Sequence, residues 1–301
     1  AGLKVAVGGN IGTPALDLLS AAVELYVLEL SSFQLESTVS LQPAVAAVLN
    51  VSPDHMDRYA DFAAYVAAKA KILRGAGVGV CNADDPTVAA MRGADDGWYF
   101  TLGETHDAKT FGVRSLEGQA TLCRGESPLL AADELRMPGL HNRANALAAL
   151  AIGSALELDA DVMAETLRRF RGLPHRTEFV AEIDGVRWYN DSKGTNPGAS
   201  IAALRGLAET DAGRTVLIAG GDCKGADFEP LTPVLAECAR AVVLIGRDRA
   251  AVAAALPEGL PHSTAVGLDD AVAKAAALAH IGDRVLLSPA CASVAIPAQN
   301  A

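Results

Sequence analysis

The hydrophobic residues of this chain gather in short runs of strand length, and segments with helical spacing lie between several of them. The runs cover residues 25–30, 45–49, 78–81, 216–219, 242–245 and 285–287. Strands that alternate with helices predict a mainly parallel, doubly wound sheet with helices on both faces. The pattern therefore predicts an α/β fold.

The middle of the chain departs from this alternation. Residues 104–135 show weaker period-two patterns with several glycines, which predicts a small antiparallel addition. A long helix is expected to begin near His141, and a second helix to cover residues 160–170. The corner Gly172-Leu173-Pro174 then stops the helix, because proline lacks an amide hydrogen.

We place a domain boundary at this corner, with one domain over residues 1–173 and a second over 174–301. The second domain is expected to open with a hairpin, because two apolar runs at 179–183 and 186–189 flank Asp184-Gly185. A further α/β unit follows it. With 301 residues, of which 50% are hydrophobic, the chain is long enough for two cores.

Charge and cysteine content narrow the class of protein. The net charge of −11 argues against nucleic acid as the main partner, because binding to phosphates requires a basic face. Five cysteines without a C-x-x-C pair predict isolated, reduced thiols that pack as small apolar residues. No apolar run reaches the ~18–20 residues that span a bilayer, and no leader is recognised, so we expect a cytoplasmic protein without a membrane partner.

Two polar stretches follow strand-like runs near the start of the chain, ELSSFQLE at 29–36 and NVSPDHMDRY at 50–59. The carboxyl ends of strands in open α/β sheets are where ligands bind. Glu29 is a candidate ligand for a hard cation such as Mg²⁺, or else a solvated strand-end carboxylate. Ser31 is a candidate ligand or a helix N-cap, and His55 lies in a charged group that is either a site or structural.

Lys69 is expected to carry its stem on the apolar face of a helix over residues 62–73, with Lys71 pointing the other way. Burial lowers the pKa of a lysine, and its neutral amine can then take up carbon dioxide to form a carbamate, a negatively charged metal ligand. The alternative is a packed stem whose ammonium reaches water.

Three further polar loops follow strand-like runs in the second half of the chain, at 190–196, 220–225 and 289–293. Pro197 is suited to the first turn of a helix, whose backbone amides, with Lys193, can hold phosphate or carboxylate. The alternative is a capping turn with solvated charges. Glycines let the backbone approach a ligand at 220–225, where Lys224 supplies a cation.

These motifs together resemble the Mur ligases of peptidoglycan synthesis, over nearly the whole chain up to Ser293. Within that family they are most similar to the branch that adds D-glutamate to UDP-N-acetylmuramoyl-L-alanine. The motifs are ELSSFQLE, NVSPDHMDRY, the Tyr65–Lys69 segment, HNRANALAAL (141–150), GLPHR (172–176), NDSKGTN (190–196), GGDCKGADF (220–228) and SPACAS (288–293).

The resemblance implies a central ATPase-type parallel sheet domain, a C-terminal Rossmann-like α/β domain, ATP, and two Mg²⁺ sites. Residues that match Mg²⁺ ligands are Glu29, His55 and a carbamylated Lys69. Residues that match the site of the uridine-linked substrate are Asn10, Ser31 and Gln34. Residues that match nucleotide contacts are Asn142, Asn145, His175, Arg176 and Asp191. Residues that match D-glutamate contacts are Lys193, Thr195, Lys224 and Ser293.

The implied reaction has two steps, phosphorylation of the L-alanine carboxylate by ATP and attack of the D-glutamate amine on the acyl phosphate. Lys69, His55 and His175 are the implied catalytic residues, with His175 a candidate acceptor of the amine proton. The implied partners are small-molecule substrates, and we expect a monomer.

The chain departs from the family pattern at two places. The family's G-x-x-x-x-G-K-[ST] phosphate loop occurs nowhere in the 301 residues, and residues 294–301 do not continue as the family does. We expect that the chain lacks an upstream uridine-nucleotide domain, the phosphate loop and its original C-terminus. The alternatives are a non-catalytic module that binds nucleotide or amino acid, or a related ATP-dependent amino-acid ligase; ELSSFQLE and DHMDRY disfavour a folate polyglutamate synthetase.

Overall fold

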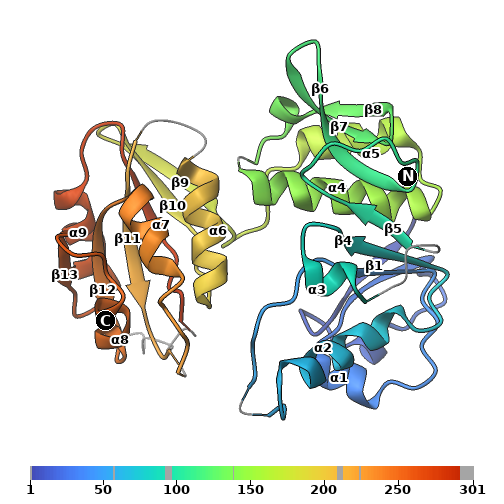
Figure 1. The fold of residues 1–301 in the computed structure, drawn as a ribbon, viewed down its shortest axis with the longest axis horizontal. Helices are drawn as coiled ribbons and strands as arrows, with labels where there is room; N and C mark the ends of the chain where they lie inside the picture. Colours follow the sequence, from blue (N-terminus) through green and yellow to red (C-terminus); the bar gives the residue numbers. More distant parts are fainter. Residues whose placement is uncertain are drawn as a thin grey trace. The chain divides into compact units, whose positions relative to one another are not determined.

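The computed structural model describes residues 2–56, 58–91, 97–137, 139–208, 213–223 and 225–291. The chain divides into two compact units (Figure 1). Unit 1 consists of Ala1–Leu135 and Arg143–Arg169, and unit 2 consists of Arg136–Asn142 and Phe170–Ala301.

Unit 1 contains a six-stranded sheet with the strand order β3-β4-β5-β6-β7-β8. Strands β3 to β6 pair in parallel, and β6, β7 and β8 pair antiparallel. The antiparallel addition predicted at 104–135 is thus confirmed, as a continuation of the main sheet. The strands are β3 (Val45–Val48), β4 (Val78–Asn82), β5 (Gly97–Phe100), β6 (Thr110–Leu116), β7 (Gln119–Arg124) and β8 (Ser127–Ala131).

A separate two-stranded parallel sheet precedes it, formed by β1 (Val5–Gly9) and β2 (Leu25–Glu29). Gly9 lies opposite Glu29 in the register, so both strands end at the same edge. This sheet keeps apolar side chains in solvent, since Val7 is 62% exposed. The sequence pattern predicted the strand over 25–30 but did not indicate that it would pair apart from β3.

The six-stranded sheet of unit 1 is buried on both faces because residues of β3 and β4 alternate between two hydrophobic clusters. Val80 packs with helix α4, while the next residue, Cys81, packs with the cluster around α2 and α3. The helices are α1 (Ser32–Ser37), α2 (Phe62–Ala70), α3 (Pro86–Ala89), α4 (Leu140–Ala155) and α5 (Ala160–Arg169), with 3₁₀ turns at Ala15–Leu18, Lys71–Leu73 and Ala132–Glu134. The helices predicted near 62–73, 141 and 160–170 are therefore confirmed.

Unit 2 is built on a six-stranded sheet with the order β13-β12-β11-β14-β10-β9. All neighbours pair in parallel except β9 and β10, which form the predicted hairpin around Asp184-Gly185. Both turn residues have positive φ, as a two-residue hairpin with a type I′ turn requires. The strands are β9 (Glu178–Ile183), β10 (Val186–Asn190), β11 (Thr215–Gly220), β12 (Ala239–Ile245), β13 (His262–Thr264) and β14 (Arg284–Leu287).

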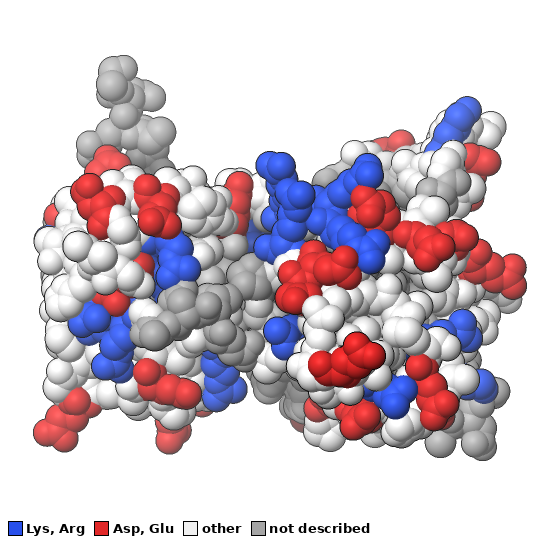
Figure 2. Space-filling model, turned by 90° about the horizontal axis from the view of Figure 1, so that it is seen from above, with Lys and Arg blue, Asp and Glu red and all other residues white. Residues whose placement is uncertain are grey.

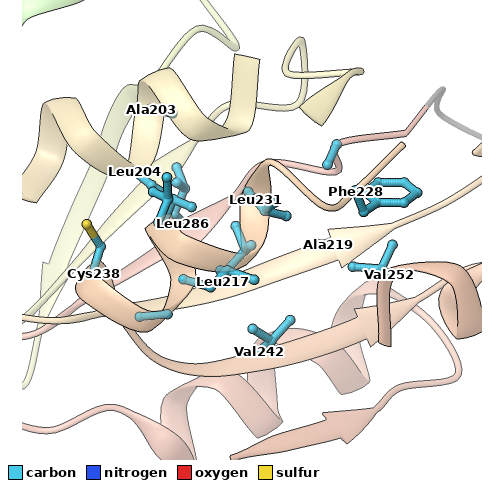
Figure 3. Packing of buried hydrophobic residues seen from close by; sticks show 14 of the residues in the cluster. Ala203, Leu204, Leu217, Ala219, Phe228, Leu231, Cys238, Val242, Val252 and Leu286 are labelled. Atoms are coloured by element: carbon cyan, nitrogen blue, oxygen red, sulfur yellow. The ribbon is translucent and has the colours of Figure 1, made fainter. Parts of the chain in front are cut away.

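Side chains of β11 and β12 alternate between two buried clusters, one on each face of the sheet. Leu217 and Val242 pack on the face covered by α6 and α7 (Figure 3), whereas Val216 and Val243 belong to the cluster that includes α9 residues. This arrangement is the doubly wound sheet that the sequence predicted. The helices are α6 (Pro197–Ala208), α7 (Leu231–Cys238), α8 (Arg249–Ala254) and α9 (Leu268–Leu278).

On the face shown in Figure 2, acidic and basic groups lie side by side, without a continuous basic surface among the described residues. None of the helices within the described ranges is both long and apolar enough to cross a membrane.

Candidate functional site

The two polar stretches near the start of the chain pack against each other in unit 1. Arg58 forms an ion pair of 2.6 Å with Glu36, and its guanidinium lies 4.4 Å from the centre of the Phe33 ring. The Phe33 ring also contacts the imidazole of His55, at a centroid distance of 4.9 Å. ELSSFQLE and NVSPDHMDRY, separate in sequence, thus form one surface.

Glu29 lies at the end of β2 with its side chain exposed to solvent. Asn10, which follows the neighbouring strand β1, donates from Nδ2 to Glu29 Oε1 at 3.3 Å, and its backbone amide donates to the Glu29 carbonyl at 2.6 Å. The parallel pairing of β1 and β2 therefore brings together Glu29, which matches an Mg²⁺ ligand of the family, and Asn10, which matches a contact of the uridine-linked substrate.

Ser31 and Gln34 form the capping box of α1. The Ser31 amide donates to Gln34 Oε1 at 2.9 Å, and the Gln34 amide donates to Ser31 Oγ at 3.2 Å. This reciprocal pair satisfies amides at the helix start. The N-cap alternative for Ser31 is confirmed, and substrate contact by these two side chains stays a prediction.

His55 lies in a tight turn and presents its ring to solvent. Its φ is +56°, its amide donates to Asp54 Oδ1 at 2.8 Å, and its side chain is 47% exposed. The Arg58 amide donates to the His55 carbonyl at 2.9 Å, which closes the turn. Nε2 lies 3.7 Å from Asp54 Oδ2. The turn holds an imidazole and a carboxylate together at the surface.

Lys69 is partly buried on α2, as the helical spacing predicted, and its Nζ lies 5.1 Å from the centre of the Tyr65 ring. Burial lowers the pKa of Lys69, although the carboxylates of Asp54 and Glu29 act in the opposite direction. Lys71 points elsewhere and donates from Nζ to the Glu36 carbonyl at 2.9 Å. The predicted difference between the two lysines is confirmed.

Tyr65, beneath Lys69, belongs to the same buried environment. Burial raises its pKa to about 12, with the charges of Asp54 and Tyr59 contributing. The low-polarity surroundings of Lys69 thus affect both side chains. Within the described ranges, no group of three or more His, Cys, Asp and Glu residues is placed to hold a metal ion.

The predicted adenine contacts, Asn142 and Asn145, lie in the first turns of α4. They are three positions apart and therefore share one side of the helix. Asn142 is half-buried and Asn145 is exposed. Beside them, His141 carries a buried Nδ1 with no hydrogen-bond partner among the described residues, and burial lowers its pKa. Sequence reasoning did not single out His141.

Three polar loops of unit 2 meet at one edge of its sheet because β10, β14 and β11 are neighbours and end on the same side. The Ala290 amide donates to the Gly194 carbonyl at 2.8 Å, and the Gly220 amide donates to the Pro289 carbonyl at 2.8 Å. The structure thus brings together loops that are between about 30 and 100 residues apart in sequence.

The loop after β10 exposes the side chains of Lys193 and Thr195. The Lys193 amide donates to the His175 carbonyl at 3.1 Å, so this loop is joined to the segment that precedes β9. Asn196 caps α6, because its Oδ1 accepts from the Ala199 amide at 2.9 Å. The predicted helix start at Pro197 is confirmed, and the two exposed side chains remain available to a ligand.

His175 and Arg176 are exposed on the segment before β9. The Nδ1 atom of His175 lies 3.0 Å from Asn190 Nδ2, and its amide donates to Glu178 Oε2 at 2.8 Å. Asp191, in contrast, is only 6% exposed and accepts hydrogen bonds from protein groups at both carboxylate oxygens. Sequence reasoning did not identify Thr177 and Ser288 as partners of Asp191, because these contacts depend on strand pairing that no local pattern encodes.

Two predicted D-glutamate contacts, Lys224 and Ser293, lie outside the described residues. Cys223 and Cys291, which lie close to these two positions in the sequence, are joined as a disulfide. The prediction of isolated thiols is wrong for this pair. They are 68 positions apart, and only the pairing of β11 with β14 brings their loops together. Within the described ranges, Cys81, Cys123 and Cys238 are buried and lie outside any disulfide, as predicted.

Comparisons with known proteins match both halves of the chain. Residues 9–153 match the model of the Mur ligase middle domain, and residues 175–291 match the Mur ligase glutamate ligase domain. The UDP-N-acetylmuramoylalanine–D-glutamate ligase of Nitrosococcus oceani is 52% identical over 295 residues, which are 97% of this chain and 64% of that protein. The same-named ligase of Methylobacillus flagellatus is 53% identical over 298 residues, with 98% and 64% covered. The chain thus spans just under two thirds of these relatives.

Solved structures share the fold at low sequence identity. MurF from Acinetobacter baumannii superposes with a TM-score of 0.72 at 20% identity, covering 96% of this chain and 68% of that one. A folylpolyglutamate synthase from Mycobacterium tuberculosis reaches a TM-score of 0.66 at 20% identity, covering 90% and 66%. The chain belongs to the Mur ligase family, of which it carries the middle domain and the glutamate ligase domain.

Proposed function

We propose that this chain forms part of an ATP-dependent ligase that adds D-glutamate to UDP-N-acetylmuramoyl-L-alanine in peptidoglycan synthesis. The observation that carries the proposal is the identity of about one half, over 97% of the chain, to relatives named as that ligase. The geometry agrees with it, because the polar loops of each unit gather at strand ends, where α/β proteins bind ligands.

Glu29, His55 and Lys69 are the proposed Mg²⁺ ligands. Magnesium prefers oxygen donors, and this set offers one carboxylate, one imidazole and one amine. The set fits the ion when Lys69 is carbamylated: the amine nitrogen forms a bond to the carbon of carbon dioxide, one C=O electron pair moves to oxygen, and a proton leaves to water. The lowered pKa of Lys69 supports this, because the reaction requires the neutral amine.

ATP is the proposed co-substrate. Asn142 and Asn145 share one side of α4 and offer amide groups suited to the edge of adenine. His175 and Arg176 are exposed on the segment before β9, where a guanidinium suits a phosphate. Asp191 enters this set only through the family resemblance, since its carboxylate is buried.

The proposed D-glutamate contacts are Lys193 and Thr195, whose exposed ammonium and hydroxyl suit a carboxylate. Lys224 and Ser293 complete the set by resemblance, from positions outside the described residues. Asn10, Ser31 and Gln34 are the proposed contacts of the uridine-linked substrate, at the ends of β1 and β2.

In the proposed reaction, a carboxylate oxygen of L-alanine attacks the terminal phosphorus of ATP, and ADP leaves. The amine of D-glutamate then attacks the acyl carbon, phosphate leaves, and the amine loses a proton, for which His175 is the proposed acceptor. Bound Mg²⁺ supplies Lewis-acid stabilisation of the phosphoryl charge. Lys193 orients the amino acid, and Arg176 balances negative charge.

One observation favours a second candidate function, a module that binds adenine nucleotide or amino acid without catalysis. The G-x-x-x-x-G-K-[ST] motif, whose backbone amides cradle the phosphates of ATP, is absent from the 301 residues. Under this alternative the chain binds D-glutamate or nucleotide and transfers no phosphate.

Calorimetric titration of this chain with D-glutamate and with L-glutamate tests the proposed amino-acid site. We expect D-glutamate to bind more tightly, and Lys193→Ala to weaken its binding by about tenfold, as loss of a charge-assisted contact does. Lys274→Ala is the matched control, because Lys274 pairs with Asp270 on α9 at 2.7 Å. Equal binding by the Lys193 variant and the unaltered chain would count against the site.

A further inference from the structure

Asp191 is a buried carboxylate that has all of its described hydrogen bonds inside unit 2. Its Oδ1 accepts from the amide of Thr177 at 3.0 Å and from the Thr177 hydroxyl at 3.3 Å. Its Oδ2 accepts from the Ser288 hydroxyl at 2.7 Å. Asp191 therefore joins the segment before β9, the loop after β10 and the end of β14.

The network continues from Ser288 to Ser200, in the first turn of α6. The two hydroxyl oxygens are 2.7 Å apart, and both residues are 0% exposed. Ser200 also donates to the Ser288 carbonyl at 3.4 Å. Buried polar groups that satisfy one another in this way hold the elements that carry them in one arrangement.

The backbone of the same loops is joined through Gly194. The Gly194 amide donates to the Asp191 carbonyl at 2.7 Å, and the Gly194 carbonyl accepts from the Ala290 amide at 2.8 Å. A β-carbon at this position would collide with Asp191 Oδ2 and Ser288 Oγ. The Asp191 carboxylate and the Ser288 hydroxyl are therefore packed against the backbone of Gly194, between Lys193 and Thr195.

We propose that Asp191, Ser288 and Ser200 are positioning residues, which hold the loop of Lys193 and Thr195 against the loop after β14 in the arrangement that binds D-glutamate. The proposal rests on the proposed function and adds a role to it, since Asp191 acts on D-glutamate binding through the loops that it joins.

The positioning role depends on the hydrogen-bond geometry of the Asp191 side chain more than on its charge. Burial raises the pKa of Asp191, while the Ser288 and Thr177 hydrogen bonds and the Arg176 charge act in the opposite direction. An asparagine side chain fits the same partners: its oxygen accepts from Thr177, its NH₂ donates to Ser288 Oγ, and the Ser288 hydroxyl turns to Ser200. Asp191→Asn is therefore the conservative variant that separates hydrogen-bond geometry from the charge of the carboxylate.

The test compares D-glutamate affinity, by calorimetry, in Ser288→Ala, Asp191→Ala and Asp191→Asn. We expect the two alanine variants to bind about tenfold more weakly, and Asp191→Asn to recover most of the loss. Ser263→Ala is the matched control, because Ser263 is a serine of the same unit whose buried hydroxyl lacks a described partner. If Asp191→Ala fails to fold, Ser288→Ala carries the comparison.

Hydrogen–deuterium exchange on the same proteins, without ligand, reports the network itself. In Ser288→Ala, peptides over 190–196 and 286–291 should exchange about tenfold faster than in Ser263→Ala, since the buried bonds that hold these amides are lost. Unchanged exchange, or faster exchange with unchanged D-glutamate affinity, overturns the proposal. An equal loss of affinity in Asp191→Asn and Asp191→Ala also overturns it, because the role would then require the charge of the carboxylate and not its hydrogen-bond geometry.

D-Glutamate binding by the unaltered chain distinguishes failure of this proposal from failure of the proposed function. If the chain fails to bind D-glutamate, the proposed amino-acid site is wrong, and so is the part of this proposal that concerns D-glutamate. Hydrogen–deuterium exchange then still shows whether the network holds the loops. If the chain binds D-glutamate and the alanine variants bind equally well, only the positioning role falls.

Discussion

Arg58 and Glu36 form an ion pair of 2.6 Å that links the turn of His55 to helix α1. Arg58 also lies over the Phe33 ring, which contacts the His55 imidazole and stacks with the Tyr59 ring. The pair raises the pKa of Arg58 and lowers that of Glu36, because each charge stabilises the other. The position of the proposed metal ligand His55 therefore depends on residues outside the ligand set.

Replacement of Arg58 by alanine should loosen this turn. The Arg58 and Tyr59 amides, which donate to the His55 carbonyl, should exchange faster with solvent in Arg58→Ala, because the ion pair and the ring contact are both lost. Hydrogen exchange of the peptide over 54–60 measures the effect. Arg74→Ala, at an exposed arginine beyond α2, is the control. Equal exchange in the two variants would show that the pair does not hold the turn.

Lys69 and Lys71 should differ sharply in their importance for activity. In the protein that carries this chain, Lys69→Ala should lower turnover by about 10³-fold or more, as loss of a group that stabilises transferring charge does. Added short carboxylates should restore part of it, because they replace the carbamate. Lys71→Ala should remain close to the unaltered turnover, since Lys71 bonds to a backbone carbonyl instead. Full turnover of Lys69→Ala would refute the proposed carbamate.

His141 should make the stability of the fold depend on pH. Burial lowers its pKa below the ordinary 6.5, so the unfolded chain takes up a proton near pH 6.5 that the folded chain does not. The contribution of His141 to the free energy of unfolding is complete above pH 6.5 and declines below it, by at most about 1.4 kcal/mol per pH unit. Urea unfolding between pH 7.5 and 5.5 should show a smaller decline for His141→Gln. Parallel curves would contradict the assignment.

The Cys223–Cys291 disulfide can be counted chemically. Alkylation of the denatured chain should label three cysteines before reduction and five after it, because five cysteines include one disulfide. Reduction should lower the free energy of unfolding by about 2–4 kcal/mol, since the bond closes a 68-residue loop. Cys223→Ser should abolish the difference, whereas Cys238→Ser should keep it. Five labelled cysteines without reductant would show that the bond does not form.

Local sequence patterns predicted the features that depend on neighbouring residues alone, namely strand alternation, helical spacing and helix capping. The alternation of Val216, Leu217 and Ile218 between two faces follows from strand geometry, and the partly buried Lys69 follows from helical spacing. The capping role of Ser31 was one of two alternatives, because serine at a helix start has a known preference.

The sequence did not predict the contacts that depend on pairing between strands distant in sequence. Asp191 and Ser288 are 97 positions apart, and Cys223 and Cys291 are 68 apart. Neither pair has a local signal, because only the order β10-β14-β11 places their loops at one edge. The separate pairing of β1 with β2 likewise depends on which strands are available as neighbours, which the spacing of apolar residues does not encode.

Amino-acid-dependent release of ADP tests the central claim most directly. The protein that carries this chain, supplied with ATP, Mg²⁺ and UDP-N-acetylmuramoyl-L-alanine, should release ADP when D-glutamate is added and should form the D-glutamyl product in equal amount. L-Glutamate, L-alanine and diaminopimelate should give little release. An intact, folded protein that releases no ADP with D-glutamate, or releases it equally with another of these amino acids, would contradict the account.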